Sequence, residues 1–231
     1  MTSERSAILP KRLVIDRGAL AEVLALFALA LVLVRLSDSA ASGHPTIRGL
    51  VPPLVWIYLP LATLLLRRRN PWAYGLDLGD WRGALRDAAL ALVAVLPLYL
   101  VGHYVFQGVI RGYRFHFRIP AALTNDVLGN LLGVAFPEEA FFRGYVLGRL
   151  EDALGPDRRF RGGRLGPAVV ISAVLFNAAH PLAGGHWWQG NVPFGLLLGW
   201  LRTRRESLVA PALVHGLTNV VFGWAELCFS R

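Results

Sequence analysis

Three short patterns of ionisable and amide side chains stand inside strongly apolar stretches of this sequence. They are Glu138-Glu139 followed by Arg143, then Phe176 with His180, then His215 with Asn219. Carboxylates and imidazoles transfer protons near neutral pH, and amide and imidazole N–H groups stabilise a developing oxyanion. Ionisable side chains are costly in hydrocarbon, so their presence there points to function. Together the patterns predict an acid/base site buried in a membrane.

The two adjacent glutamates are expected to have different roles. Neighbouring side chains on an α-helix diverge by about 100°, so Glu138 and Glu139 should not face the same partner. Glu139 lies four residues before Arg143 on one helix face, where the two side chains would form a structural ion pair. Glu138 has no nearby cation, and desolvation would make it a better proton acceptor. Glu138 is therefore the candidate base.

Pro137 precedes the two glutamates. Inside a helix its ring displaces the backbone hydrogen bond to the carbonyl of Gly133. The sequence thus predicts a kink or opening that would admit water to a carboxylate in an otherwise dry setting.

The two histidine patterns have helical spacing. Phe176 and His180 are four residues apart and share a face, and Asn177 lies on a nearby arc. His215 and Asn219 are also four apart and would present an imidazole and an amide toward one point. Two hydrogen-bond donors that converge in a water-excluded pocket can stabilise an oxyanion.

Composition places these patterns in a membrane. The 231-residue chain is 55% hydrophobic and only 17% charged, which is greasier than an ordinary soluble domain. Runs long enough to cross about 30 Å of hydrocarbon recur along it. The predicted fold is an all-α, polytopic transmembrane helical bundle of seven or eight spans. The seven that we place are, approximately, Gly18–Val34, Leu50–Leu66, Ala88–Ile110, Asp126–Leu147, Gly166–Leu182, a run that follows the turn Ala183–Gly190 and reaches Leu201, and Leu208–Phe229.

The net charge of +9 invites a nucleic-acid interpretation, which the distribution of charge disfavours. With a cytoplasmic N-terminus, 17 of the 24 basic residues fall on the cytoplasmic side, as the positive-inside rule expects. Aromatic residues interleave with arginines over Arg111–Arg118, but this pattern is typical of anchors at a membrane interface. We expect an integral protein of a bacterial inner (cell) membrane, with lipid contact and no nucleic-acid partner. Twenty-three arginines against one lysine are consistent with a GC-rich bacterial genome.

One membrane domain accounts for residues 1–231. Short loops around Gly43–Gly49, Asn70–Trp81 and Gly155–Gly163 separate the spans. The first hydrophobic run lacks a small-residue cleavage site and is interpreted as a retained span rather than a signal peptide. The single cysteine, Cys228, excludes a disulfide within the chain.

The same residues resemble the CAAX protease and bacteriocin-processing (CPBP, or Abi) family of intramembrane endopeptidases. Its signature is Glu-Glu-x-x-x-Arg, then Phe-x-x-x-His, then His-x-x-x-Asn or Asp, and each element has a match here. The resemblance covers about Leu131–Asn219, within a catalytic core expected over residues 124–229. It implies hydrolysis of a peptide bond in the C-terminal region of a membrane-associated protein substrate.

By that likeness, Glu138 and His180 would activate a water, and His215 with Asn219 would bind the oxyanion. The supporting residues would be Glu139, Arg143, Phe176 and Asn177. Prenylated CAAX proteins are the eukaryotic substrates of the family, whereas compact bacterial members include a myxosortase-like group that processes C-terminal sorting tails and others linked to bacteriocins. We expect no cofactor. The alternative is a catalytic zinc held by Glu138, His180 and His215, although the chain lacks His-Glu-x-x-His.

Two non-proteolytic functions compete with this interpretation. A transporter or proton-relay protein would also bury Glu, His and Arg, but it would more often show matching halves, and no internal repeat is evident. A binding protein, such as a scaffold or immunity protein, could keep the bundle without catalysis. It would have no need for so many costly buried polar groups.

Overall fold

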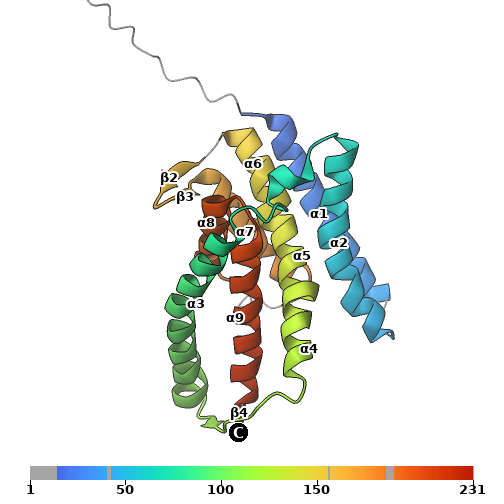
Figure 1. Ribbon diagram of the computed structural model, residues 1–231. Helices are drawn as coiled ribbons and strands as arrows, with labels where there is room; N and C mark the ends of the chain where they lie inside the picture. The colour runs from blue at the N-terminus through green and yellow to red at the C-terminus, as the bar shows by residue number, and fades with distance from the viewer. Residues whose placement is uncertain (1–14, 41–42, 156, 186–189, 231) are drawn as a thin grey trace, which may run out of the picture.

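The computed structural model forms an all-α bundle, and it describes residues 15–40, 43–155, 157–185 and 190–230 (Figure 1). Seven helical rods follow one another in these residues, as the sequence predicts. They are α1 (Arg17–Ala40), α2 (Pro45–Leu66), α3 (Trp81–Tyr104) with its π-helical continuation η2 (Val105–Ile110), a long helix over residues 123–154, α7 (Pro167–Leu182), α8 (Val192–Arg205) and α9 (Val209–Leu227). A short 3₁₀ helix, η1 (Pro71–Tyr74), joins α2 to α3. Residues 186–189 of the predicted turn Ala183–Gly190 lie outside the described residues.

The long helix carries the paired glutamates and changes its winding four times. Its segments are α4 (Leu123–Leu128), the π-helical η3 (Gly129–Ala135), α5 (Phe136–Glu139), the π-helical η4 (Ala140–Val146) and α6 (Leu147–Leu154). Pro137 is the second residue after the first π segment. A π turn is wider than an α turn, and such turns are frequent at functional sites. The opening that Pro137 predicts therefore takes the form of a widened helix rather than a break.

Polar side chains fix where two of the shorter helices begin. The carboxylate of Asp157 accepts hydrogen bonds from the backbone N–H groups of Ala168 and Val169 at 3.1 and 2.9 Å, in the first turn of α7. The side-chain oxygen of Asn191 accepts from the backbone N–H of Phe194 at 3.1 Å, at the start of α8. These bonds satisfy N–H groups that a helix leaves free at its N-terminus.

Two small antiparallel strand pairs lie in the connections. β1 (Arg114–Phe115) pairs with β4 (Phe229–Ser230), and β2 (Arg158–Phe160) pairs with β3 (Gly163–Leu165). The second pair is a hairpin where the sequence predicted only a loop. Arg161 and Gly162 both have positive φ angles, as a two-residue hairpin turn requires.

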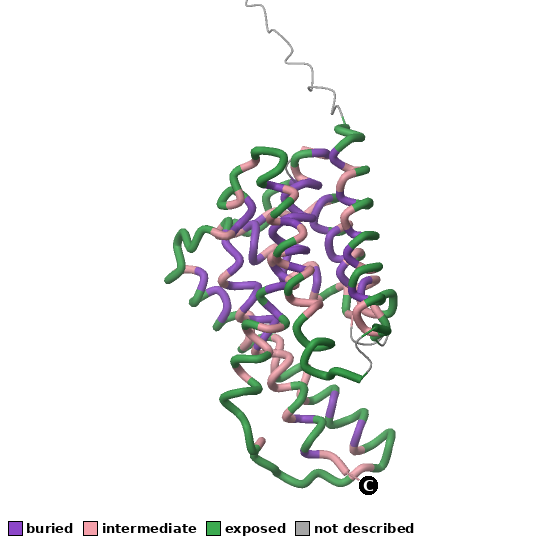
Figure 2. The backbone as a smooth tube through the Cα atoms, turned by 90° about the vertical axis from the view of Figure 1, so that its right-hand side faces the viewer, coloured by how far each residue is buried: buried purple, intermediate pink, exposed green. Residues whose placement is uncertain are grey.

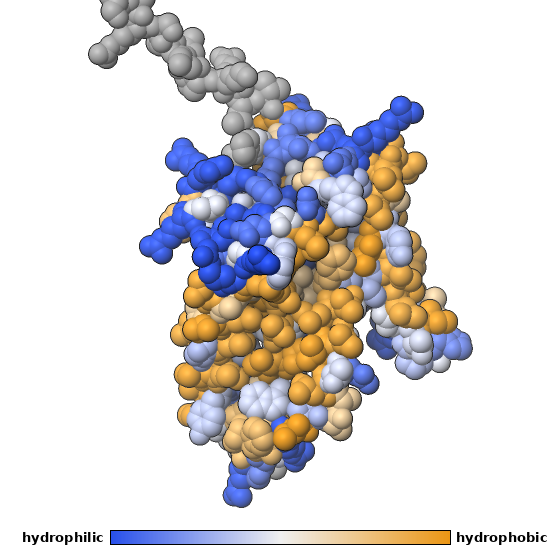
Figure 3. All heavy atoms as spheres, in the orientation of Figure 1, coloured by the Kyte–Doolittle hydropathy of each residue, from blue (hydrophilic) through white to orange (hydrophobic). Residues whose placement is uncertain are grey.

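Three helices are long and apolar enough to cross a membrane: α1, α2 and the rod over Trp81–Ile110. On the face seen in Figure 3, a broad apolar zone lies between two more hydrophilic ends. With a rise of 1.5 Å per residue, the 16 residues of α7 extend about 24 Å, which is less than the roughly 30 Å hydrocarbon core. The chain is an integral membrane protein, and α7 with 16 residues and α8 with 14 residues are shorter than the roughly 20 residues that a full span needs.

The basic residues gather at one end of the molecule, which we call the basic end. It is where α1 begins and α2 and α8 end, and it carries Arg67 to Arg69, Arg158, Arg159 and Arg202 to Arg205. Figure 3 shows this hydrophilic end at the top. The end where α9 finishes and β1 pairs with β4 is opposite to it (Figure 1).

The buried core lies toward the basic end (Figure 2). Its centre is aromatic, with Trp56 of α2 and the adjacent rings of Phe141 and Phe142 on η4. The centroid of the Trp56 ring lies 4.8 and 5.5 Å from those two rings. Phe142 in turn lies 5.2 Å from Phe176 of α7 in an edge-to-face contact. This cluster joins α2, η4 and α7 behind the polar residues of the site.

Candidate active site

The predicted ion pair between Glu139 and Arg143 is present. Nη1 of Arg143 donates to Oε1 of Glu139 at 2.9 Å, and both side chains are 0% exposed. Nη2 of Arg143 donates to the carbonyl oxygen of Gly195 on α8 at 3.4 Å. Through the bond to Gly195, Arg143 ties the long helix to α8. Loss of either member of the Glu139–Arg143 pair should be strongly destabilising, because it leaves a buried charge without its partner.

The two glutamates share a partner, which the sequence did not predict. Nδ1 of His215 lies 2.9 Å from Oε1 of Glu139, and Nε2 of the same ring lies 3.8 Å from Oε2 of Glu138. The expectation that adjacent glutamates could not face one partner is wrong, because an imidazole has nitrogens on two edges. The wide π turns on either side of α5 also depart from the regular spacing on which that expectation depended.

Phe176 stands at the centre of these polar groups. The guanidinium of Arg143 lies over its ring, 4.0 Å from the centroid, in a cation–π contact. The rings of His180 and His215 meet it edge to face, with centroids 4.9 and 5.5 Å away. Its backbone carbonyl lies 2.9 Å from Nδ1 of His180. Phe176 thus contacts the side chains of Arg143, His180 and His215.

Glu138 and His180 line one pocket of about 240 Å³. The pocket is otherwise mainly apolar, and its lining residues are Val34, Pro52, Trp56, Glu138, Phe142, Ala179, His180, Ala183 and Gly185. The side chain of Glu138 is 20% exposed. Its Oε2 has no hydrogen-bond partner among the described residues. With Nδ1 of His180 donating to the Phe176 carbonyl, Nε2 is the acceptor nitrogen.

This geometry can be set beside known proteins. Residues 120–221 match the model of the family described as type II CAAX prenyl endopeptidase Rce1-like. Over these residues the chain is similar to the CAAX protease family. No curated protein and no solved structure matches it. The matched region contains all three patterns, and the similarity supports intramembrane protease activity on protein or peptide substrates in general.

The two asparagines of the predicted site are placed differently. Asn219 lies one turn beyond His215 on α9, is half-buried, and has no hydrogen bond within the part of the chain that the structure describes. Asn177 lies beside Gly190, and its Oδ1 is buried without a partner among the described residues. The amide of Asn219 thus makes no hydrogen bond in that part of the chain, and Asn177 lies at the end of the α7–α8 connection.

The three residues considered as zinc ligands do not form a ready metal site. In the described ranges, no group of three His, Cys, Asp or Glu side chains lies close enough together to hold a metal ion. Nδ1 of His215 is engaged by Glu139, and Nδ1 of His180 by a backbone carbonyl. Glu138 and His215 lie 3.8 Å apart, but the described residues do not bring His180 into a three-ligand group with them, so we derive no step through a metal.

Sequence reasoning missed the small residues that let α7 and α8 approach. A Cβ added to Gly195 would lie 3.0 Å from Cβ of Ala173, and one added to Gly199 would lie 2.7 Å from Cγ1 of Val169. Two glycines four residues apart form the small-xxx-small pattern typical of close helix pairs in membranes. That pattern could have identified α8 as the helix whose Gly195 carbonyl receives Arg143.

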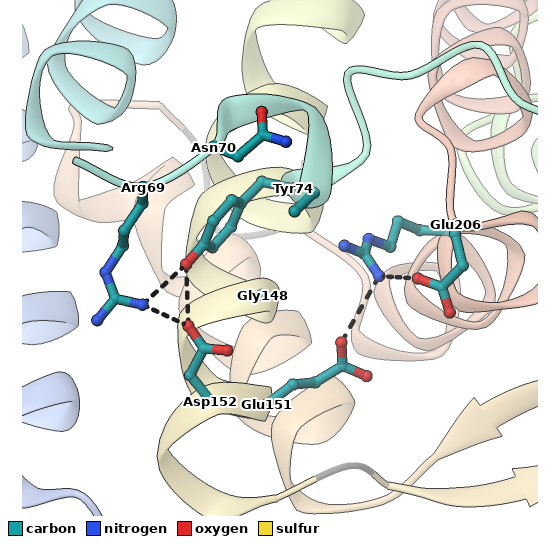
Figure 4. A pocket seen from close by; sticks show the side chains of 9 residues that line it. Arg69, Asn70, Tyr74, Gly148, Glu151, Asp152 and Glu206 are labelled. Carbon is teal, nitrogen blue, oxygen red and sulfur yellow. Dashed lines mark hydrogen bonds and ion pairs between the residues drawn. The ribbon is translucent and has the colours of Figure 1, made fainter. Parts of the chain in front are cut away.

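A second cavity, of about 310 Å³, lies at the basic end (Figure 4). Its carboxylates are already paired. Asp152 accepts from Arg69 at 3.0 Å and from the hydroxyl of Tyr74 at 2.9 Å, and Glu206 accepts from Arg202 at 2.7 Å. Burial raises the pKa of Tyr74, and the hydrogen bond to Asp152 raises it further. These contacts join η1, α6 and α8 into a closed polar layer.

Proposed function

We propose that this chain hydrolyses a peptide bond near the C-terminus of a membrane-associated protein by activating a water with Glu138 and His180. The observation that carries the proposal is the pocket in which these two side chains meet. Both side chains line it: Oε2 of Glu138 makes no hydrogen bond among the described residues, and His180 carries an acceptor nitrogen. Both can accept a proton from water, and the contact of the Glu138 carboxylate with Nε2 of His215 is long, at 3.8 Å.

In the proposed reaction, Glu138 takes one proton from the water while the water oxygen bonds to the peptide carbonyl carbon. The carbon–nitrogen bond then breaks, and the proton that Glu138 holds passes to the leaving amine. The products are the substrate with a new carboxyl terminus and the released C-terminal segment, which carries the new amine. His180 orients the water through its acceptor nitrogen.

His215 and Asn219 would stabilise the tetrahedral intermediate. In its protonated form His215 would donate from Nδ1 to Glu139, and its Nε2–H, 3.8 Å from the Glu138 carboxylate, would donate to the oxyanion. Asn219 lies one helical turn away and adds an amide donor.

We further propose an orientation and a substrate class. The concentration of arginines at the basic end supports a cytoplasmic N-terminus in a bacterial inner membrane. The substrate would be a membrane protein with a C-terminal processing segment, of the kind that myxosortase-like proteases remove.

The test compares the C-termini of membrane and surface proteins, by mass spectrometry, between the native host and a Glu138→Gln strain. Glu138→Gln preserves the shape of the side chain and removes the base. We expect a set of proteins that keep their C-terminal tails only in the mutant. Asp126→Asn is the matched control, because it makes the same chemical change at an exposed position on the same long helix. Identical termini in a Glu138→Gln strain with normal protein levels would contradict proteolysis and favour transport or binding.

A further inference from the structure

Burial changes abruptly along the long helix at Glu138. From residue 141 to residue 150 every position is buried, whereas residues 121–134 are mostly exposed. The exposed positions include large apolar side chains such as Leu128 and Leu132, the latter 66% exposed. Figure 2 shows the same asymmetry for the whole bundle. The candidate base thus lies at a boundary: on one side the long helix is buried, which we call the closed half of the molecule, and on the other side it is mostly exposed, which we call the open half.

The closed half lies between the site and the basic end. Directly beyond the glutamates, the ring of Phe141 packs on Trp56 and the hydroxyl of Tyr145 donates to Glu22 of α1 at 2.9 Å. One turn further, Nε of the buried Arg149 donates to the same Glu22 at 2.9 Å. An aromatic layer and an ion-pair layer therefore separate the pocket from the basic end.

The pocket is lined by residues near those ends of α1, α2 and α7 that lie away from the basic end. Val34 lies six residues before the end of α1, and Pro52 lies seven residues after the start of α2. Ala183 and Gly185 follow directly after α7. Because α1 and α7 begin near the basic end and α2 finishes there, all of these residues lie on the opposite side of the pocket. On that side, α1 and α2 stand apart from α4 (Figures 1 and 3).

We propose that the site takes its substrate from the membrane face opposite the basic end. We also propose that an apolar side chain next to the cleaved bond lies in the pocket formed by Val34, Pro52 and Trp56. This inference rests on the proposed proteolytic function and adds the face of access and the specificity. The pocket, at about 240 Å³, exceeds several-fold the roughly 30 Å³ share of one water, so it can hold a side chain beside the catalytic water. With a cytoplasmic N-terminus, the substrate segment is presented on the outer face.

Chemical labelling tests the face of access without needing a known substrate. Cys228 is buried, and Cys228→Ser gives a background without cysteine. Single cysteines are then placed in the pocket by Ala183→Cys and Pro52→Cys, with Ala73→Cys and Ala121→Cys as exposed controls at the basic and opposite ends. A charged, membrane-impermeant maleimide is applied to spheroplasts or to inverted vesicles.

We expect both pocket cysteines to react from the same side as Ala121→Cys, at least tenfold faster than from the side of Ala73→Cys. Reaction from the side of Ala73→Cys would overturn the inference, because the pocket would open through the basic end. Reaction from neither side would overturn it as well, because the pocket would then face only lipid. The two controls define the faces, so the result does not depend on the absolute orientation of the chain.

Specificity is tested with Trp56→Ala, which enlarges the pocket. Among the new C-termini found by mass spectrometry, cleavage beside the largest apolar residues should rise at least tenfold relative to the wild type, with Trp56→Phe in between. If Trp56→Ala does not accumulate, Val34→Ala widens the same pocket from α1. Unchanged residue preferences in a cleaving variant would refute the pocket assignment. Absence of any Glu138-dependent cleavage would instead refute the proposed function, while the labelling result would stand.

Discussion

Arg143→Ala is the substitution that the structure predicts to be most damaging without touching the candidate base. Arg143 is fully buried and has three interactions: the ion pair with Glu139, the bond to the carbonyl of Gly195, and the cation–π contact with Phe176. The variant loses all three and leaves the Glu139 carboxylate buried with only His215 as a partner.

The size of the effect follows from the distances. At an effective dielectric constant of about 20, unit charges 2.9 Å apart attract by about 6 kcal/mol. The charged hydrogen bond adds roughly 1.5–3 kcal/mol and the cation–π contact about 2 kcal/mol. Desolvation of the arginine opposes these gains by several kcal/mol. We therefore expect Arg143→Ala to lower the free energy of unfolding by about 3–5 kcal/mol, which is the usual cost of breaking a buried pair.

The assay is equilibrium unfolding of the purified protein in bicelles, measured by steric trapping. A loss of 3–5 kcal/mol shifts the unfolding equilibrium roughly 10²–10⁴-fold. Arg86→Ala is the matched control, because Arg86 is an exposed arginine and its loss should cost less than about 1 kcal/mol. The double variant Glu139→Gln with Arg143→Met should lose less free energy of unfolding than the sum of the losses of the two single variants, since it leaves no unpaired charge. An Arg143→Ala protein within 1 kcal/mol of the wild type would refute the reasoning.

The remaining predictions concern chemistry and packing. Chelation with EDTA or phenanthroline should leave Glu138-dependent cleavage unchanged, because a carboxylate is the base; complete loss that zinc restores would show a metal mechanism. His180→Gln should reduce cleavage at least about 100-fold in a peptide-release assay, with unchanged unfolding, because the half-buried ring lines the pocket; near-normal turnover would remove it from the mechanism. Gly199→Ala should destabilise the protein by about 1–3 kcal/mol, because the new Cβ would lie 2.7 Å from Val169. Gly223→Ala, which meets no atom within 4 Å, is its control, and equal stabilities would refute the tight α7–α8 contact.

Hydropathy predicted the helical rods well because each apolar run must satisfy its backbone hydrogen bonds internally. All seven predicted segments coincide with helices, although α2 begins at Pro45 rather than Leu50. Hydropathy did not reveal that α7 and α8 are shorter than a span. It also missed the β2–β3 hairpin, whose residues are polar and whose pairing depends on the turn at Arg161 and Gly162.

The site was predicted in its residues but not in its connections. Helical spacing correctly paired Glu139 with Arg143, because both lie on one short arc of one helix. The contact of both glutamates with His215 depends on how two distant helices pack and on π turns, and neither is encoded in the local spacing. The roles of Glu138, His180, His215 and Asn219 in catalysis remain predictions for the experiments above.

The two contacts of one Glu139 oxygen restrict which substitutions this position can tolerate. Oε1 is the acceptor for both Arg143 and His215, so the same atom serves the assembly of the helices and the position of an imidazole. A genetic screen should therefore find no substitution of Glu139 that separates loss of folding from loss of activity. Oε2 of Glu138 makes no hydrogen bond among the described residues and meets His215 only at 3.8 Å, so inactive but well-folded variants should arise there. Selection for a stable fold alone would then conserve Glu139 and its position beside His215, whereas Glu138 could be substituted.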